Sequence, residues 1–456
     1  MKFRLLELDF FEREVRLRLP FRFGVVTLRE APQAFVRARI RLQNGAEAEG
    51  GAAELLAPKW FDKSLALSNE QNFEQLRTSL RLARDAYLSG GMNTGYGHFI
   101  AHYEGQIAAG ARRGLNRLTA GFGPALVDRA ALDALCRALG VSFYDAVRGN
   151  LPAIDVPRGF LQALAPAPRI AARHTVGLLD RLSGGAARPR AGDGLPETLE
   201  EVIERYGHRW FKLKVAGNVR ADVERLEAIA AVLDRLPYAY AVTLDGNEQY
   251  EHAAGVLELW RCLKTSPRLA RLVSSIAFIE QPISRQNAFA ADVAALAAER
   301  PVLIDESDDS LDAFARARAL GYSGVSSKSC KGLYKAILNA ARCREWNREA
   351  GAERYFLSGE DLTTQAGLAV QQDLALAAIL GLTHVERNGH HYVNGMAGLP
   401  EAEQSAFLAA HPDLYERSHG AVRVRIVRGE LAIGSLACAG FASGALPDWS
   451  TMKEMK

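Results

Sequence analysis

The sequence lacks the features that mark secreted, membrane-spanning and nucleic-acid-binding proteins. No apolar run approaches the roughly 18 residues of a membrane span, and residues 1–20 carry charges every few positions instead of the apolar core of a signal peptide. The 56 basic and 53 acidic residues are interspersed, which argues against nucleic acid or a membrane as a partner. Cysteines are few and none forms a C-x-x-C pair: Cys136, Cys262, Cys330, Cys343 and Cys438. That spacing argues against a thiolate metal site and a disulfide framework, and it predicts a cytoplasmic protein.

The 456 residues of the chain divide into three parts by the spacing of their apolar residues. Residues 1–60 place apolar side chains near a period of two and contain the turn signal Asn44-Gly45, which predicts β-strands. Residues 68–148 place them three and four apart, with Gly closing each run, which predicts helices. A Pro-rich segment at 150–168 marks a boundary. We therefore predict an α+β capping domain (1–150), a catalytic domain (151–395) and a C-terminal segment (396–456) that packs back on the capping domain.

The middle part alternates short apolar strands with amphipathic helices. The predicted strands are HTVGLLD, RWFKLKV, AVTLDGN, IAFIEQP, VLIDES, GVSSKS, RYFLSGE and THVERNG. Thr198 and Glu201 form a capping box, which predicts a helix start after the first strand. Eight strand and helix pairs over about 220 residues are typical of a parallel barrel. The fold class expected is α/β, a modified (β/α)8-type TIM barrel with an α+β N-terminal cap.

Acidic residues stand at the ends of three consecutive predicted strands. They are Asp245, Glu280 and Asp305, each about one β/α unit from the next. The carboxyl ends of barrel strands meet at one mouth, so the three side chains should share a cavity. Three clustered carboxylates need a cation to stay ionised, and Mg²⁺ prefers oxygen ligands. Taken singly, an Asp or Glu at a strand end more often caps a helix or lies on the surface.

Lysines flank this acidic set on two other predicted strands. Lys212 and Lys214 alternate with the apolar Phe211 and Leu213, so both lysines should face the barrel interior. Lys328 ends the sixth strand, on the opposite side of the mouth. A lysine near other cations can act as a base close to neutral pH. The C–H group on the carbon next to a carboxylate is a very weak acid. A divalent ion stabilises the enediolate that forms when its proton is removed.

Five segments together resemble a known family. FKLKVAGN, LDGNEQY, FIEQP, LIDES and VSSKSCKG are similar to motifs of the enolase superfamily, in its muconate-lactonizing-enzyme-like subgroup (the mandelate racemase/muconate lactonizing enzyme family). The resemblance covers most of the chain: PFRFGVVT (20–27) and GAAE (51–54) look like the family's substrate-capping loops. The mandelate racemase branch uses a histidine on strand seven, where this chain reads FLSGED. That difference disfavours the branch.

The resemblance implies a role for each matched residue. Asp245, Glu280 and Asp305 would bind Mg²⁺, or Mn²⁺ in its place, and the two acid/base groups would be Lys214 and Lys328. Lys212 would lie near the substrate carboxylate. Residues beside these groups would be Asn247 and Glu306, with Glu306 pairing with Lys328. The resemblance also implies a homo-oligomer and a small-molecule carboxylate substrate.

Other polar residues at the mouth match no specificity pattern. Lys331 is equally consistent with a rim position and with a substrate contact. Glu360 and Glu386 end the last two strands, whose residues usually tune substrate choice. His390 and His391 could bind a metal or act in acid/base chemistry, but adjacent residues point in different directions, which favours a structural or rim role.

Several reactions share this first proton transfer. Lysines on both faces favour a racemase or epimerase acting on an N-acyl amino acid, a dipeptide or a similar acid. Alternatives are a lyase that works by β-elimination (an acid-sugar dehydratase or an o-succinylbenzoate synthase) and a cycloisomerase. A non-catalytic metal-binding relative is disfavoured because every key position holds a competent residue. A Schiff-base aldolase would not need three carboxylates on successive strands.

Overall fold

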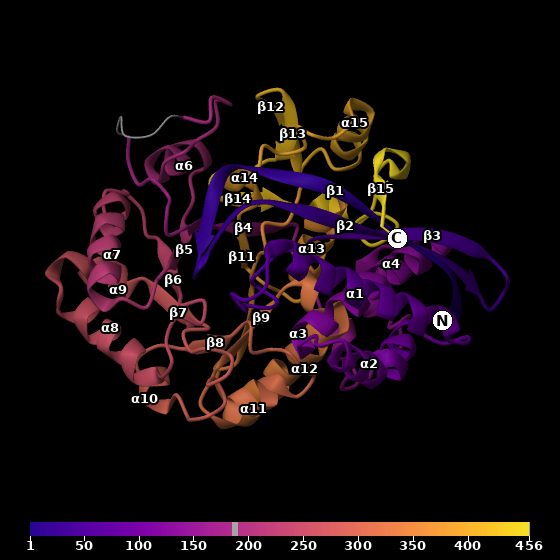
Figure 1. Cartoon of the computed structure of the whole chain (residues 1–456), viewed down its shortest axis with the longest axis horizontal. Coiled ribbons are helices and arrows are strands. Elements are labelled where there is room, and N and C mark those ends of the chain that lie inside the picture. The colour runs from indigo at the N-terminus through magenta and orange to yellow at the C-terminus, as the bar shows by residue number, and fades with distance from the viewer. Residues whose placement is uncertain (185–189, 456) are drawn as a thin grey trace.

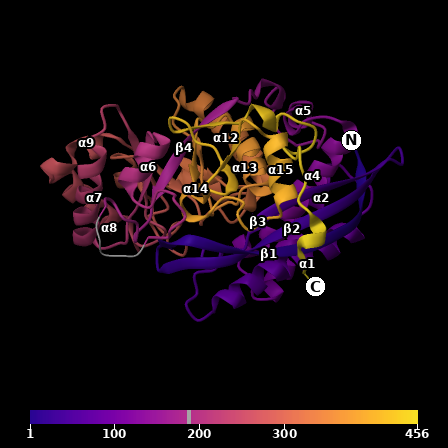
Figure 2. The ribbon, with the colours of Figure 1, turned by 90° about the horizontal axis from the view of Figure 1, so that it is seen from above.

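An antiparallel sheet opens the chain and carries both of its ends (Figures 1 and 2). The structure is a computed structural model, in which residues 1–184 and 190–455 are described. In sheet order the strands are β15 (Lys453–Glu454), β1 (Phe3–Phe23), β2 (Val26–Leu42) and β3 (Glu47–Leu55). The last strand therefore pairs with the first, with Glu454 opposite Phe11.

Helices pack against this sheet to complete the capping region. They are α1 (Asn69–Ser89), α2 (Gly95–Arg112), α3 (Arg117–Ala120), α4 (Phe122–Leu139) and α5 (Phe143–Arg148). The side chain of Ser68 accepts from the backbone of Gln71 in a capping box that starts α1, and Gly140 ends α4 in the left-handed conformation. Gly50 lets β3 approach α4 closely, because a Cβ there would lie 2.2 Å from the backbone nitrogen of Ala134.

The middle of the chain is a closed barrel of eight parallel strands. In barrel order they are β4 (Arg169–Val176), β5 (Trp210–Lys214), β6 (Ala241–Asp245), β7 (Ile276–Glu280), β8 (Val302–Ile304), β9 (Gly324–Ser327), β10 (Phe356–Gly359) and β11 (His384–Arg387). Pairing of β11 with β4 closes the ring. The predicted TIM barrel with an N-terminal cap is thus confirmed.

Helices surround the barrel strands. They are α6 (Leu199–Tyr206), α7 (Val219–Leu233), α8 (Ala253–Thr265), α9 (Ala270–Ser274), α10 (Ala294–Ala297), α11 (Ala313–Ala319), α12 (Leu333–Ala350), α13 (Leu368–Ile379) and α14 (Gly389–Tyr392). The predicted capping box of Thr198 and Glu201 starts α6. Outward-facing apolar side chains such as Phe211, Leu213 and Val242 pack beneath these helices.

Two details differ from the sequence prediction. The first barrel strand runs over 169–176 and not over 174–180, because its inward side chains are the polar Arg173 and Thr175, which hide the strand from an apolar pattern. The GAAE segment lies within strand β3 and is not a loop.

The C-terminal segment contacts both other parts of the molecule. Its elements are α15 (Glu401–Ala410), β12 (Tyr415–Ser418), β13 (Ala421–Val424), β14 (Glu430–Ala432) and the strand β15 described above. Strand β14 pairs antiparallel with β4 of the barrel, whereas β15 pairs with β1 of the cap. The five cysteines are free thiols. Among the described residues, no helix has the length and apolarity needed to cross a membrane.

Candidate active site

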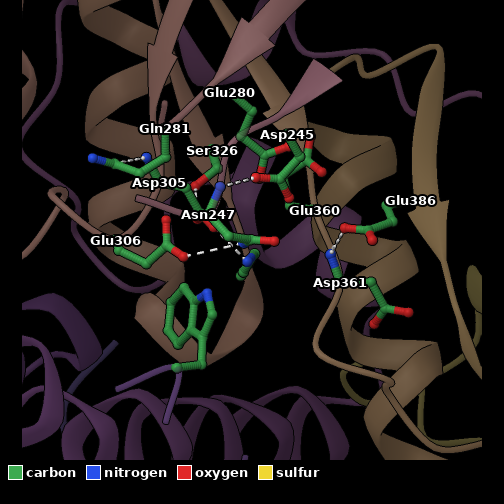
Figure 3. A network of polar contacts seen from close by, with 12 residues as sticks. Asp245, Asn247, Glu280, Gln281, Asp305, Glu306, Ser326, Glu360, Asp361 and Glu386 are labelled. Carbon is green, nitrogen blue, oxygen red and sulfur yellow. Dashed lines mark hydrogen bonds and ion pairs between the residues drawn. The ribbon is translucent and has the colours of Figure 1, made fainter. Parts of the chain in front are cut away.

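Three carboxylates meet at the carboxyl ends of neighbouring barrel strands. Asp245 ends β6, Glu280 ends β7, and Asp305 follows β8 directly. Asp245 and Glu280 are register partners, and all three residues are fully buried. Figure 3 shows Asp245 and Glu280 pointing toward one another, with Asp305 beside them. The structure therefore brings together the three acidic residues that the sequence spacing predicts to share a cavity.

Lys212 lies at the centre of four carboxylates. Its Nζ is 2.7 Å from a carboxylate oxygen of Glu280 and 2.7 Å from one of Glu360, and it is also 2.9 Å from Glu386 and 3.0 Å from Asp245. Burial opposes the charge of the ammonium group, yet the carboxylates raise the pKa of Lys212 well above its ordinary value. Lys212 is therefore the common counter-ion of these four carboxylates.

Lys214 and Lys328 approach the same cavity from opposite walls. Lys214 ends β5 and Lys328 follows β9, four strands away in a ring of eight. The Nζ of Lys214 is 2.5 Å from Asp245 Oδ2, and the Nζ of Lys328 is 2.6 Å from Asp305 Oδ2. Burial opposes the charge of Lys328, but Asp305 outweighs it and raises the pKa. Each lysine is thus held by a different carboxylate of the trio.

Lys331 supports the site from beneath. Its Nζ donates to Ser326 Oγ at 2.7 Å and lies 2.9 Å from Asp308 Oδ2. It is also 3.3 Å from the backbone oxygen of Asp305. These contacts tie Lys331 to the loop after β8.

Asn247 and Glu306 lie next to each other at the mouth, as Figure 3 shows. The Nδ2 of Asn247 donates to Glu306 Oε1 at 3.3 Å, and the Nζ of Lys63 is 3.7 Å from the same carboxyl group. We expected Glu306 to pair with Lys328, but the ammonium group of Lys328 contacts Asp305 instead. Burial raises the pKa of Glu306 to about 7.

Glu360 and Glu386 reach across the barrel to hold Lys212. Glu360 also contacts the guanidinium group of Arg173. Glu386 accepts from Thr175 Oγ1 at 2.5 Å. Residues of the first, second, seventh and eighth strands are thereby tied into one buried network. The sequence places both glutamates at strand ends, but only the closure of the ring shows this common partner.

The cap supplies an apolar roof that sequence reasoning identified only in part. The segment 20–27 forms the hairpin tip between β1 and β2, and Phe21 and Phe23 from it line the cavity. The Trp60 ring lies over Lys328, with the Nζ 4.2 Å from the ring centroid. Lys63, also from the cap, donates to the backbone oxygen of Asn247 at 2.5 Å. Neither Trp60 nor Lys63 lies in a sequence motif that indicates a place in the site.

Gln281 is a further residue missed by the sequence analysis. Its Oε1 accepts from the backbone nitrogens of Asp305 (2.7 Å) and Ser307 (3.1 Å), and its Nε2 donates to Ser307 Oγ at 2.7 Å. This amide therefore fixes the backbone that carries Asp305. A glutamine directly after a predicted strand-end glutamate is the only local signal for it.

The space between these groups is narrow, with a volume of about 20 Å³. It is lined by Phe21, Phe23, Leu28, Ala57, Trp60, Lys212, Lys214, Asn247, Lys328, Asp361, Leu362, Thr363, Glu386 and Asn388. A cationic floor under an apolar roof suits a small carboxylate with an apolar portion.

The chemistry of the donor set fits a hard divalent cation. The three acidic side chains at the strand ends offer only oxygen ligands, and the buried Oδ1 of Asn247 and Oε2 of Glu306 accept no hydrogen bond from any described residue. Burial and the neighbouring carboxylates raise the pKa of Glu280 well above its ordinary value, and a cation would reverse that effect. The ammonium groups of Lys212 and Lys214 lie against Asp245, so they would have to shift to admit an ion.

A separate group of histidines lies outside the barrel wall. Among residues 1–184 and 190–455, these are His174, His208 and His390, each of which offers one ring nitrogen as a metal ligand. The three nitrogens lie within 4.8 Å of one another. Burial lowers the pKa of His208 to about 4 and lowers those of His174 and His390 well below the ordinary value. His391, beside them, contacts Asp180 at 3.9 Å and is not part of the group.

Comparison with known proteins finds one matching family and many similar structures. Residues 194–410 match the family described as Enolase C-terminal domain-like. An N-succinyl-L-Arg/Lys racemase from Bacillus cereus is 28% identical over 153 residues, which are 32% of this chain and 37% of that protein. The match thus spans little more than a third of the racemase.

Two solved structures show the same fold over nearly the whole chain. The 2-chloromuconate cycloisomerase from Rhodococcus opacus 1CP is 17% identical with a TM-score of 0.60, covering 98% of each chain. A dipeptide epimerase from Enterococcus faecalis V583, complexed with Mg and the dipeptide L-Leu-L-Tyr, is 14% identical with a TM-score of 0.59. That similarity covers 97% of this chain and 99% of the epimerase.

Proposed function

Because this chain belongs to the enolase superfamily, in its mandelate racemase and muconate lactonizing enzyme-like group, we propose that it is an enzyme that removes and returns the proton next to a substrate carboxylate. One observation supports the proposal most strongly. Lys214 and Lys328 reach the same cavity from opposite walls of the barrel, and a different carboxylate holds each of them. An amine on either face of one carbon is the arrangement that inversion of that carbon requires.

The proposed reaction is a racemisation or epimerisation. Lys214 removes the proton from one face of the α-carbon and Lys328 delivers a proton to the other, and the roles exchange in the reverse direction. Asp245 and Asp305 hold the two side-chain nitrogens in place. The lysine that removes the proton is a neutral amine at that moment, and the other is an ammonium group that donates its proton. The roof formed by Phe21, Phe23 and Trp60 limits the access of water that would compete for the proton.

A divalent cation, proposed as Mg²⁺, is assigned to Asp245, Glu280 and Asp305. When bound, it would stabilise the negative charge of the enediolate and offset the carboxylate charge that raises the pKa of Lys328. Lys212, surrounded by four carboxylates, keeps these ligands together. We therefore propose Lys212 as a positioning residue, and a direct contact with the substrate carboxylate as the less favoured role.

The proposed substrate is an N-acylated amino acid or a dipeptide. The apolar side chains that line the cavity suit an acyl group or an uncharged side chain, and the lysines opposite them suit the carboxylate. The partial likeness to an N-succinyl-L-Arg/Lys racemase and the shared fold with a dipeptide epimerase support this class.

Each lysine can be tested separately with single enantiomers in D₂O and Mg²⁺. If the lysines serve opposite faces, Lys214→Ala should abolish α-deuterium exchange of one enantiomer and Lys328→Ala that of the other. Racemisation should fall by about 10²–10⁴-fold in both variants. Lys59→Ala is a control, since Lys59 lies in the cap and donates to the backbone oxygen of Ser64 at 2.7 Å. Equal loss of both enantiomers in only one variant would contradict a two-lysine mechanism.

A further inference from the structure

Three imidazoles lie close together outside the barrel, at the seam, which is the place where β11 pairs with β4. His174 lies on β4 between Arg173 and Thr175, whose side chains point into the barrel, so His174 points outward. His208 precedes β5, and His390 follows β11 within α14. The first, second and eighth strands of the barrel each bring one histidine to this point.

The three rings form a nearly equilateral triangle. Their centroids are 5.3 Å apart for His174 and His208, 5.2 Å for His174 and His390, and 5.1 Å for His208 and His390. Three imidazoles bound tetrahedrally to one ion, with metal–nitrogen bonds of about 2.0–2.1 Å, would have centroids about 5.2 Å apart. The observed triangle therefore has the size that a single tetrahedral ion requires.

The ring nitrogens are also oriented as ligands. The Nδ1 of His208 lies 2.9 Å from the backbone oxygen of Ala172, which fixes the proton on Nδ1 and leaves the lone pair on Nε2. That Nε2 is buried and has no hydrogen-bond partner among the described residues. A backbone carbonyl behind a ligand histidine is the usual way in which proteins fix the tautomer that binds a metal.

The other two histidines complete the set of nitrogens. His174 Nδ1 and His390 Nε2 lie 3.1 Å apart and share a hydrogen bond, which a bound ion would replace. Their separation is close to the spacing of two nitrogens on one tetrahedral ion. His174 and His208 are buried, whereas His390 is partly exposed. His390 lines a cleft together with Tyr206 and Arg423, which gives an ion a route to the seam and leaves room for a fourth ligand.

We propose that His174, His208 and His390 bind one divalent transition-metal ion of the Zn²⁺ class, at a site separate from the oxygen-lined mouth of the barrel. Three neutral imidazoles in a tetrahedral arrangement favour Zn²⁺ over Mg²⁺, which prefers oxygen ligands. The ion would hold together the closing strands β4 and β11 and the start of β5. Glu386 and Lys212, which belong to the carboxylate network, lie on two of these strands.

The test is a titration of metal-free protein with Co²⁺ in the presence of excess Mg²⁺, followed by its visible absorption. One equivalent should bind with the intense bands of four-coordinate Co²⁺, and one equivalent of Zn²⁺ should displace it. The melting temperature should rise with Zn²⁺. His208→Gln and His390→Gln should each lose the equivalent and the rise in melting temperature.

Two controls separate this site from the barrel mouth. His411→Gln changes another buried histidine, whose Nδ1 lies 3.1 Å from Ser435 Oγ, and should keep the Co²⁺ equivalent. Asp305→Asn should also keep it while losing Mg²⁺ binding. Absence of a four-coordinate Co²⁺ spectrum in the unaltered protein would overturn the proposal even if the histidine variants failed to fold. Unchanged Co²⁺ binding in both histidine variants would overturn it as well.

Discussion

The two faces of the barrel wall carry polar groups of opposite character. Inside, Lys212 lies among four carboxylates, and every group in that network is charged or binds a charge. Outside, three imidazoles lie together with pKa values lowered by burial. Strand β4 contributes to both sets, with Thr175 directed inward and His174 directed outward. Strand alternation thus explains the outward direction of His174, whereas His208 and His390 lie just outside β5 and β11.

This difference predicts that the two sites choose different ions. Hard oxygen ligands suit Mg²⁺, whereas neutral imidazoles suit Zn²⁺. Changes on one side of the wall should therefore leave the ion on the other side in place.

The largest effect is expected from Glu280→Gln. This change removes one charged ligand from the oxygen set, so we expect loss of Mg²⁺ binding and a fall in turnover of at least about 10³-fold. Isothermal titration with Mg²⁺ and a racemisation assay would measure the two effects. The Co²⁺ equivalent at the histidines should remain, and its loss would show that the two sites are not independent.

A large loss of stability is expected from Lys212→Met. The change leaves four buried carboxylates without their common counter-ion, which should lower the free energy of unfolding by about 3–5 kcal/mol. Lys264→Met removes a half-exposed ion pair with Glu299 and should cost less than about 1 kcal/mol. Urea unfolding of metal-free protein would compare them. Similar losses in the two variants would contradict the importance given to Lys212.

A smaller effect concerns the dependence of stability on pH. Asp180 accepts a hydrogen bond from the hydroxyl group of Tyr392. Burial raises the pKa of Asp180 to about 6. The folded state then holds a proton that the unfolded chain releases near pH 4. Protonated Asp180 therefore adds to the free energy of unfolding in full below that pH, and this addition is lost as the pH rises through 6. Between pH 4.5 and 7 the loss should be about 2 kcal/mol. Asp180→Asn should remove it, which urea unfolding at both pH values would measure. A pH dependence identical to that of the unaltered protein would contradict the raised pKa.

The smallest effect is expected at the roof of the cavity. Trp60→Leu removes the ring that lies over Lys328, a contact of about 1 kcal/mol, and should lower kcat/KM by up to about tenfold. Trp60→Phe keeps an aromatic face and should retain most of the activity. Steady-state kinetics at several pH values would measure both variants. If the leucine and phenylalanine variants behave alike, the ring does not act through Lys328.

The sequence predicts the parts of this structure that depend on local pattern. Strand ends at Asp245, Glu280 and Asp305 follow from apolar runs of regular spacing, and the inward direction of Lys212 follows from alternation with Phe211 and Leu213. Those features need only the geometry of a single strand and its neighbour. The first barrel strand was misplaced because its inward residues are polar.

Contacts that depend on closure of the barrel could not be predicted. Lys212 meets Glu360 and Glu386 only because β11 pairs with β4, and no spacing in the sequence encodes that meeting. His174, His208 and His390 are likewise far apart in the chain, and no short metal-binding motif contains them. Trp60 comes from a cap loop whose position depends on packing of a separate sheet.

The most direct test of the central claim is α-deuterium exchange in D₂O. The panel would contain N-acyl amino acids, dipeptides, acid sugars and aryl-succinates, each with and without Mg²⁺, followed by mass spectrometry and NMR. We predict exchange of an N-acyl amino acid or a dipeptide that needs the cation, is accompanied by inversion and disappears in the double variant Lys214→Ala/Lys328→Ala. Exchange that persists in the double variant, or no exchange of any compound by Mg²⁺-loaded protein, would contradict the assignment of the two lysines as the acid/base pair.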